Sequence, residues 1–334
     1  MKIINIIGAG LIGQERIKAV AKLKGRGLPI KIGWVHDPYN PRLPALAEEH
    51  GFTIEPDASN LFKSHADLVI VACPHDVAVE HTCNALRANQ LVLIEKPLGR
   101  DLSEMQKIAL AAKCGKGLFV GLNYRFMPGI AALVNDWRKQ KFGRPISLRL
   151  QLGHGGKPGD DKTWKLDPVR CGGGALLDPG IHLLDIISLM TNTAPDLKMR
   201  LSWQGFWDTG IEEDVQLMFS SGPISITADV SVVRWRSHFE IFALGTEGYG
   251  QVTGRGRSYG PQRYLRGLRW GWQNAKNQAS SEELVIESDC EDSFADEIAA
   301  CLGFENTSLL KPANLLDGIA VMNLYNSAKT FSFS

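Results

Sequence analysis

Three side chains in this sequence are suited to moving a proton near neutral pH, namely Lys96, Asp178 and His182. Asp178 and His182 are four positions apart, which on a helix places both side chains on one face. A carboxylate beside an imidazole can orient the ring and hold a general base near a neutral pKa. A structural interpretation fits equally well, because Asp178 before Pro179 is a typical helix N-cap and His182 is then a core histidine.

Lys96 lies in the segment Glu95-Lys96-Pro97, directly after an apolar run that we predict to be a strand of a parallel sheet. Ligands of such sheets bind at the carboxyl ends of the strands. A lysine there can hydrogen-bond a reacting hydroxyl, and its charge lowers the pKa of that hydroxyl. A surface lysine paired with Glu95 is the alternative, and position alone does not decide between the two.

A glycine pattern, Gly8-x-Gly10-x-x-Gly13, follows the first predicted strand and opens the first predicted helix. Gly8 permits a tight turn, Gly10 lets a pyrophosphate approach the backbone, and Gly13 permits close packing of helix and strand. Phosphates then lie at the helix N-terminus, where free N–H groups favour an anion. We therefore predict a dinucleotide site, with Leu11 and Ile12 also contacting the cofactor, although a glycine turn of an ordinary α/β protein shows the same pattern.

Asp37 ends the second predicted strand, where a carboxylate can accept hydrogen bonds from the adenine ribose and repels a 2′-phosphate. This position favours NAD over NADP. NADP is not excluded, because Arg42 can meet a phosphate. An Asp-Pro turn with Pro38 is the structural alternative.

The first 122 residues contain the alternating strands and helices that would position the candidate residues described above. Short apolar runs alternate with helical patterns, which indicates a parallel sheet covered by helices on both faces. The predicted strands are Lys2–Gly8, Ile30–Asp37, Phe52–Glu55, Ala66–Cys73, Leu91–Glu95 and Leu118–Leu122. The predicted helices are Leu11–Lys24, Pro44–His50, Val77–Asn89 and Glu104–Cys114.

From about residue 123 the pattern changes, and strands follow one another without intervening helices, which predicts an antiparallel sheet. The predicted strands are Pro145–Leu152, Met199–Phe206, Asp214–Phe219, Ile224–Val233 and His238–Leu244, with helices at Ile130–Lys139, Phe294–Leu302 and Ala313–Phe331. We therefore predict an α/β Rossmann domain over residues 1–122. An α+β domain with a large, mostly antiparallel open sheet follows over residues 123–334 and serves substrate binding and oligomerisation.

Together the motifs resemble the Gfo/Idh/MocA oxidoreductase family over nearly the whole chain. The matching elements are Gly8-x-Gly10-x-x-Gly13, the Pro74 loop with His81, Glu95-Lys96-Pro97, Asn123-Tyr124-Arg125-Phe126 and Gly172-Gly173-Gly174-x-x-x-Asp178-x-Gly180-x-His182. The resemblance implies NAD(P)-dependent oxidation or reduction of a sugar or cyclitol alcohol, with Lys96, Asp178 and His182 in catalysis.

With that family in view, further site residues are expected. Pro74, His75, Glu95 and Lys96 join the cofactor-binding set. Tyr124 and Arg125, just past the sixth strand, are expected to line the substrate cleft. A glycine-rich segment from Gly153 to Gly159 resembles family members of surface-polysaccharide and nucleotide-sugar pathways, and predicts substrate contacts from His154 and Trp164. A glycine-rich loop with no substrate role is the alternative.

Composition excludes several classes of protein. The 334 residues are 44% hydrophobic and 22% charged, which favours packed domains over disorder. A net charge of +1 makes nucleic acid an unexpected partner. No apolar run approaches the ~20 residues that span a bilayer, and no signal-peptide cleavage pattern is present, so we expect a cytoplasmic protein without a membrane partner. The six cysteines contain no Cys-x-x-Cys pair, so we expect reduced thiols and no metal site.

Two further features predict partners. Trp203, Trp207 and Trp235 accompany the strands of the second domain, so an uncovered apolar sheet face and a homodimer or homotetramer are expected. Residues 251–281 contain six basic residues and no acidic one, whereas residues 282–297 contain eight acidic residues. The basic segment can steer an anionic substrate such as a nucleotide sugar or sugar phosphate, or its arginines can pair with the acidic segment.

Three alternatives remain open at this point. One is a dehydrogenase of inositol or a free sugar. Another is an enzyme that keeps its nucleotide and exchanges hydride between two sugars. The third, from a different class, is a non-catalytic NAD-binding regulator, which need not retain Lys96, Asp178 and His182 together.

Overall fold

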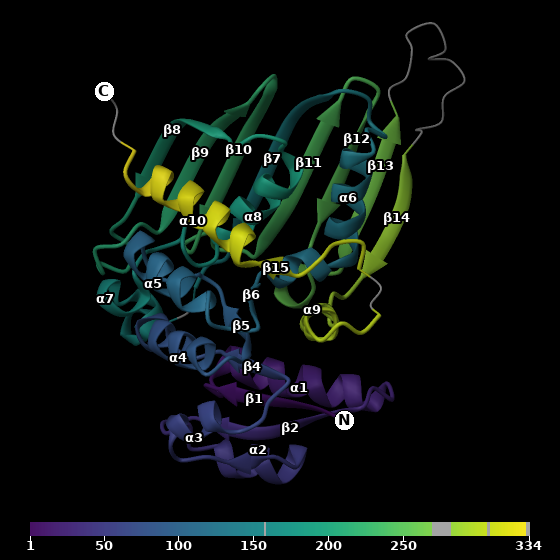
Figure 1. Cartoon of the computed structure of the whole chain (residues 1–334). Coiled ribbons are helices and arrows are strands. Elements are labelled where there is room, and N and C mark those ends of the chain that lie inside the picture. Colours follow the sequence, from purple (N-terminus) through teal and green to yellow (C-terminus); the bar gives the residue numbers. More distant parts are fainter. Residues whose placement is uncertain (157, 269–281, 306–307, 332–334) are drawn as a thin grey trace, which may run out of the picture.

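Two sheets organise the chain, one beyond the other along the molecule (Figure 1). The computed structural model describes residues 1–156, 158–268, 282–305 and 308–331. The first sheet has seven strands in the order β15-β6-β5-β4-β1-β2-β3, and the second has eight in the order β14-β13-β12-β11-β7-β10-β9-β8. The predicted fold class, a Rossmann parallel sheet followed by an α+β domain with a mostly antiparallel sheet, is confirmed.

The first sheet is parallel from β1 to β6 because helices connect its strands and cover both faces. Its strands are β1 (Lys2–Ile7), β2 (Ile30–His36), β3 (Thr53–Ile54), β4 (Leu68–Val71), β5 (Leu91–Glu95) and β6 (Gly117–Gly121). Its helices are α1 (Leu11–Gly25), α2 (Leu43–His50), α3 (Ala58–Lys63), α4 (His75–Arg87) and α5 (Leu102–Ala112). Every residue of β4 is buried, as its unbroken apolar run predicts. Helix α3 was not predicted.

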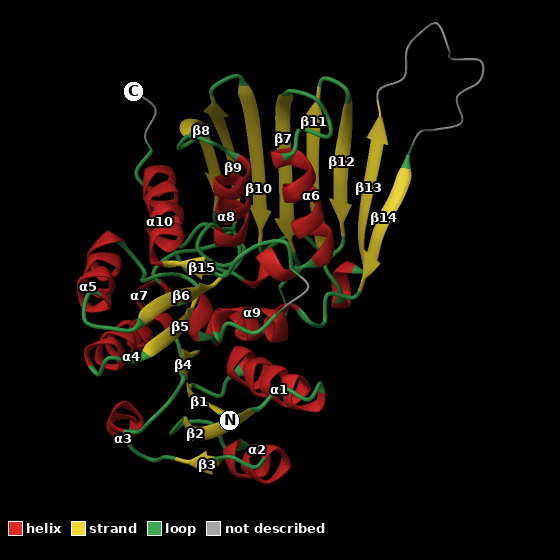
Figure 2. Ribbon diagram, turned by 45° about the vertical axis from the view of Figure 1, so that its right-hand side comes forward, coloured by secondary structure: helices red, strands yellow, loops and turns green. Residues whose placement is uncertain are grey.

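The second sheet is antiparallel except where β10 runs parallel to β7. Its strands are β7 (Pro145–Gly153), β8 (Asp196–Trp203), β9 (Asp214–Ser221), β10 (Ile224–Ser231), β11 (His238–Gly245), β12 (Gly248–Thr253), β13 (Gln262–Leu268) and β14 (Glu283–Ser288). Helices α6 (Pro128–Arg138), α8 (Ile181–Met190) and α10 (Leu315–Lys329) lie on one face (Figure 2). The sequence prediction missed β12, β13 and β14, because glycines and charged residues interrupt their apolar pattern.

The end of the chain returns to the first sheet. Helix α9 (Ser293–Cys301) packs against α1, with Ile298 and Ala299 in the same apolar cluster as Ile17 and Val20. Strand β15 (Ala313–Asn314) then pairs antiparallel with β6, so α10 begins at Leu315 rather than at Ala313. A domain boundary at residue 122 stays a prediction, and both halves of the chain build the region between the sheets.

Candidate active site

The glycine loop has the shape that a dinucleotide pyrophosphate requires. Gly8 has φ +90°, and a Cβ there would lie 2.6 Å from the Ala72 backbone. A Cβ on Gly13 would lie 2.0 Å from the Gly8 carbonyl oxygen, so helix and strand approach too closely for any side chain. A Cβ on Gly10 would meet nothing within 4 Å, which leaves open space at the N-terminus of α1. The loop therefore fits the predicted nucleotide, with the phosphates on the free N–H groups of the helix.

The side chain of Asp37 is hydrogen-bonded to the backbone of the glycine loop. Its Oδ2 accepts a hydrogen bond from the Ala9 N–H at 2.7 Å, and its Oδ1 accepts from the N–H groups of Tyr39 and Asn40. A carboxylate has about four acceptor sites, so these three bonds leave room for about one ribose hydroxyl. The carboxylate of Asp37 lies beside the glycine loop, where its negative charge repels the 2′-phosphate of NADP.

Lys96 and Asp178 form an ion pair at the carboxyl edge of β5, 82 positions apart in sequence. The other carboxylate oxygen of Asp178 accepts from Nζ of Lys165 at 3.3 Å. Burial by itself would raise the pKa of Asp178, but Lys96 and Lys165 outweigh it and hold that pKa well below its usual range. Asp178 is therefore a permanent anion between two ammonium groups.

His182 is buried beside this pair on α8, and the Tyr124 ring stacks on its imidazole at 3.8 Å between centroids. Its Nδ1 is buried without a hydrogen-bond partner. Burial, followed by the charges of Lys96 and Arg255, holds the pKa of His182 well below its usual range. The imidazole is consequently neutral at pH 7 and able to accept a proton.

The helical relation predicted for Asp178 and His182 is wrong. Helix α8 begins at Ile181 with Gly180 as its N-cap, so Asp178 lies before the helix and does not cap it. Consecutive turns precede α8, in which the Asp178 N–H donates to the Gly174 carbonyl oxygen and the Gly180 N–H to that of Ala175. Tertiary contacts with Lys96 and Lys165, rather than helical spacing, bring the carboxylate into the site.

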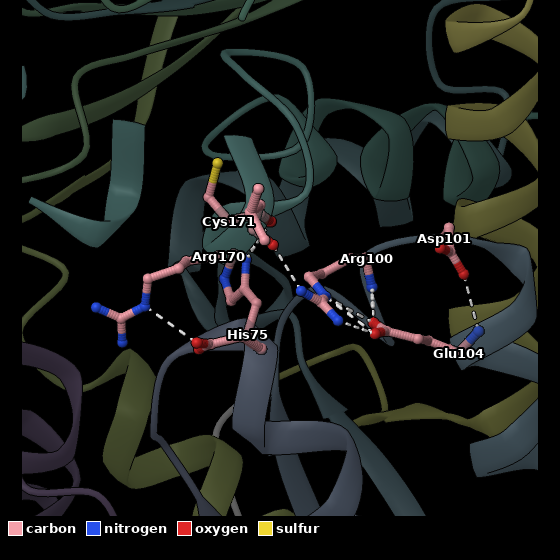
Figure 3. Close-up of polar contacts among 8 residues, drawn as sticks. His75, Arg100, Asp101, Glu104, Arg170 and Cys171 are labelled. Carbon is pink, nitrogen blue, oxygen red and sulfur yellow. Dashed lines mark hydrogen bonds and ion pairs between the residues drawn. The ribbon is translucent and has the colours of Figure 1, made fainter. Parts of the chain in front are cut away.

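A segment before the glycine motif is held against the first domain (Figure 3). The carbonyl oxygen of Cys171, at the end of α7 (Pro168–Cys171), lies 2.9 Å from Nδ1 of His75 at the start of α4. Arg170 pairs with Asp76 on α4, and Arg100 donates to the Val169 carbonyl oxygen at 2.6 Å. These contacts hold residues 169–171 against Arg100 and the start of α4.

His154 and Trp164, both predicted to contact substrate, lie near residues already described. The Trp164 ring contacts His75 edge to face at 4.8 Å. His154 has a pKa lowered by burial, and Asp178 and Lys165 both act on its charge, which places it at the same site. The pKa of His75 falls to about 4 through burial and the charge of Lys96, so this ring is neutral as well.

Two predicted residues have their polar groups engaged elsewhere. Arg125 is buried and donates to Asp185 on α8 and Asp317 on α10, so its guanidinium joins two helices. Glu95 accepts from Arg16 at 2.7 Å instead of pairing with its neighbour Lys96. Arg125 and Glu95 are therefore chain neighbours of Tyr124 and Lys96 whose charges are paired with other residues.

Sequence reasoning missed Lys165 and the separate role of Arg255. The guanidinium of Arg255 lies 3.8 Å from the Tyr259 ring centroid and 5.4 Å from that of Tyr124. Arg255 belongs to the basic segment, but its sequence neighbours gave no sign that its side chain lies near Tyr124 and His182. Lys165 follows the glycine-rich loop in a stretch without periodicity, so no local pattern marked it.

A dinucleotide-binding domain joined to an open sheet, with lysine, carboxylate and imidazole between them, defines a class of oxidoreductase. A family model for the oxidoreductase family with an NAD-binding Rossmann fold matches residues 3–122, and the GFO/IDH/MocA C-terminal domain model matches residues 134–250. This chain belongs to the Gfo/Idh/MocA oxidoreductase family. The family predicted from the sequence motifs is thereby confirmed.

Two curated relatives are named as oxidoreductases of sugar derivatives. The chain is 29% identical over 188 residues to 1,5-anhydro-D-fructose reductase from Ensifer adhaerens, covering 54% of this chain and 55% of the relative. It is 28% identical over 190 residues to glucose-6-phosphate 3-dehydrogenase from Bacillus subtilis (strain 168), covering 56% and 53%. The chain thus spans about half the length of these curated relatives.

Solved structures share the fold over nearly the full chain. Levoglucosan dehydrogenase in complex with NADH and L-sorbose has a TM-score of 0.79 at 17% identity, covering 98% of this chain and 97% of that one. A 3-ketoreductase from Actinomadura kijaniata in complex with NADP and TDP-benzene gives the same TM-score at 16% identity, with the same coverage. Within the described residues, no helix is long and apolar enough to cross a membrane.

Proposed function

We propose that this protein is a nicotinamide-dependent dehydrogenase or reductase acting on a secondary alcohol or ketone of a sugar-like ring. The Lys96–Asp178 pair beside a buried, neutral His182 carries this proposal. The family membership and its sugar-active relatives support it. A nucleotide sugar or sugar phosphate is the leading substrate class, and inositols and free sugars are the alternatives.

In the oxidative direction, His182 accepts the hydroxyl proton while the C–H bond of the same carbon breaks and its electron pair leaves as hydride. A bound oxidised nicotinamide supplies the hydride acceptor. Lys96 donates a hydrogen bond to the developing alkoxide and stabilises its charge. Asp178 positions Lys96 through their ion pair. The alcohol is oxidised to a ketone, and reduction follows the reverse path.

A substrate screen tests this function. The protein is mixed with NAD or NADP and with nucleotide sugars, sugar phosphates, free sugars or inositols, and absorbance of the reduced nicotinamide is followed. Turnover with one class supports the proposal. The nicotinamide cofactor could also bind while none of these substrate classes reacts, even with an added keto-sugar acceptor. That result would favour the non-catalytic NAD-binding regulator. Turnover that requires the acceptor identifies the enzyme that exchanges hydride between sugars.

Cofactor preference follows from Asp37. We expect NAD to bind at least about tenfold more tightly than NADP, since a 2′-phosphate must approach this carboxylate. Asp37→Ala should reduce the difference between the affinities for NAD and NADP. Arg42→Ala should weaken the binding of NADP and leave that of NAD unchanged. Fluorescence titration of the reduced cofactors measures both effects. A wild-type preference for NADP contradicts the prediction.

Assembly through the helix-free face of the second sheet is also proposed. Apolar Leu201, Trp203 and Met218 are exposed at one edge of this face, and Phe242 stacks on Tyr249 nearer the other edge. Burying such side chains favours a homodimer or homotetramer.

We expect Met218→Glu to lower the oligomer mass by a factor of two or more at micromolar concentration, measured by light scattering. Leu110→Glu, on exposed α5, is the matched control and should change nothing. A wild-type protein that scatters as the 36.7 kDa monomer contradicts this assembly.

A further inference from the structure

Three arginines near the active site differ in the charges around them. Arg16 is fully buried between Glu95 and Glu297, at 2.6 and 2.7 Å. Arg125 is buried between Asp185 and Asp317. Among the described residues, which include every Asp and Glu of the chain, no Asp or Glu carboxylate lies within ion-pair distance of Arg255. The arginine beside the catalytic histidine is thus the one without a counter-charge.

The surroundings of Arg255 hold its charge in a fixed place. Its guanidinium contacts the rings of Tyr259 and Tyr124, and Tyr124 in turn stacks on His182. Its Nε is buried and has no hydrogen-bond partner. The aromatic contacts offset part of the cost of removing this cation from water, and an unused donor remains.

The loop that carries Arg255 is itself anchored on both sides. Arg257 ion pairs with Glu15 on α1, and Ser258 hydrogen-bonds Ser237 at 2.9 Å. The loop of Arg255 is therefore fixed to α1 on one side and to the start of β11 on the other, so its position is set before any ligand binds.

Other arginines of the basic segment are neutralised by carboxylates. Arg263 pairs with Glu287, and Arg266 pairs with Asp136 and Glu283. With the Arg257–Glu15 pair, these contacts match the alternative in which the arginines of the segment have structural partners. Arg269 and Lys276 lie outside the described residues. In the candidate active site, the Asp178 carboxylate pairs with Lys96 and Lys165 and not with Arg255.

We propose that Arg255 binds an anionic group of the substrate, a carboxylate or a phosphate, so that the preferred substrate is an acidic sugar derivative. A guanidinium with an unused Nε–H donor, desolvated and held against aromatic rings, can donate two parallel hydrogen bonds to oxygens of such a group. The proposal rests on the proposed function, since it places the anion within the site where the sugar reacts.

The test compares anionic and neutral forms of one sugar. Glucose 6-phosphate and glucuronate are each compared with glucose, for wild type, Arg255→Met, Arg255→Lys and the control Arg263→Gln, at an exposed arginine paired with Glu287. In wild type, kcat/KM should favour at least one anionic form. Arg255→Met should reduce kcat/KM for that form by about 10- to 100-fold and for glucose by less than threefold. Arg255→Lys should retain part of the preference for the anionic form, and Arg263→Gln should retain it in full.

A binding measurement separates this inference from the catalytic proposal. Inorganic phosphate, glucose 6-phosphate and glucuronate are titrated into the protein with NADH bound, by calorimetry. If wild type binds one of these anions and Arg255→Met does not, the inference is supported even where no sugar reacts. Comparing the phosphate ligands with glucuronate shows which anionic group is bound. Equal losses for charged and neutral sugars, a wild-type preference for glucose, or anion binding unaffected by Arg255→Met overturns it.

Discussion

Replacing His182 or Lys96 by alanine is expected to lower kcat by roughly 10²–10⁴, with the affinity for NAD nearly unchanged. In the proposed mechanism, the buried and neutral His182 is the base, and the ammonium of Lys96 stabilises the developing alkoxide. Stopped-flow or steady-state turnover with the substrate found in the screen measures kcat, and fluorescence titration measures cofactor affinity. His65→Ala is the control, because this histidine is exposed on the first domain.

The pH dependence distinguishes catalysis from a structural role. Burial and then Lys96 lower the pKa of His182 below its usual 6.5, so the acidic limb of the oxidation rate should lie below pH 6.5. Lys96→Ala removes one of the charges that lower this pKa, so its residual activity should show an acidic limb at higher pH. Near-normal turnover in both variants would assign the chemistry to other residues or favour the regulator.

The largest effect on stability is expected at Arg16. This arginine is completely buried and pairs with Glu95, next to Lys96, and with Glu297 on α9. Arg16→Met leaves two carboxylates without their cation, and removing one partner of a buried pair costs about 3–5 kcal/mol of unfolding free energy. Chemical denaturation measures the loss. Lys18→Met, on the exposed side of the same helix, should have almost no effect.

Glu297 adds a pH signature to this cluster. Burial raises its pKa from 4.5 to about 7, so the folded protein holds this proton more tightly than the unfolded chain. Its contribution to stability is therefore fully present below about pH 4.5 and is lost as the pH rises through about 7. Glu297→Gln should flatten the pH dependence of Tm across this window. A wild-type Tm that rises steadily through the window, unchanged by the substitution, would show that Glu297 is ionised throughout.

The sequence by itself determined the elements whose signal is local. The spacing of Gly8, Gly10 and Gly13 reflects backbone distances within one turn, and the unbroken apolar run of β4 reflects burial on both faces. Motifs at strand ends, such as Lys96, could be placed because parallel strands present their carboxyl ends at one edge. The order of motifs was enough to identify the family.

Tertiary structure decided which charges meet. Asp178 finds Lys96 and Lys165 across the fold, and Arg16 finds Glu297, 281 positions later, because α9 returns to α1. Strands β12 to β14 were missed since their stability comes from pairing and from α6, not from their own apolar pattern. Similarly, only the fold separates Arg255 from Arg257, because charge pairing depends on distance in space, which local sequence does not encode.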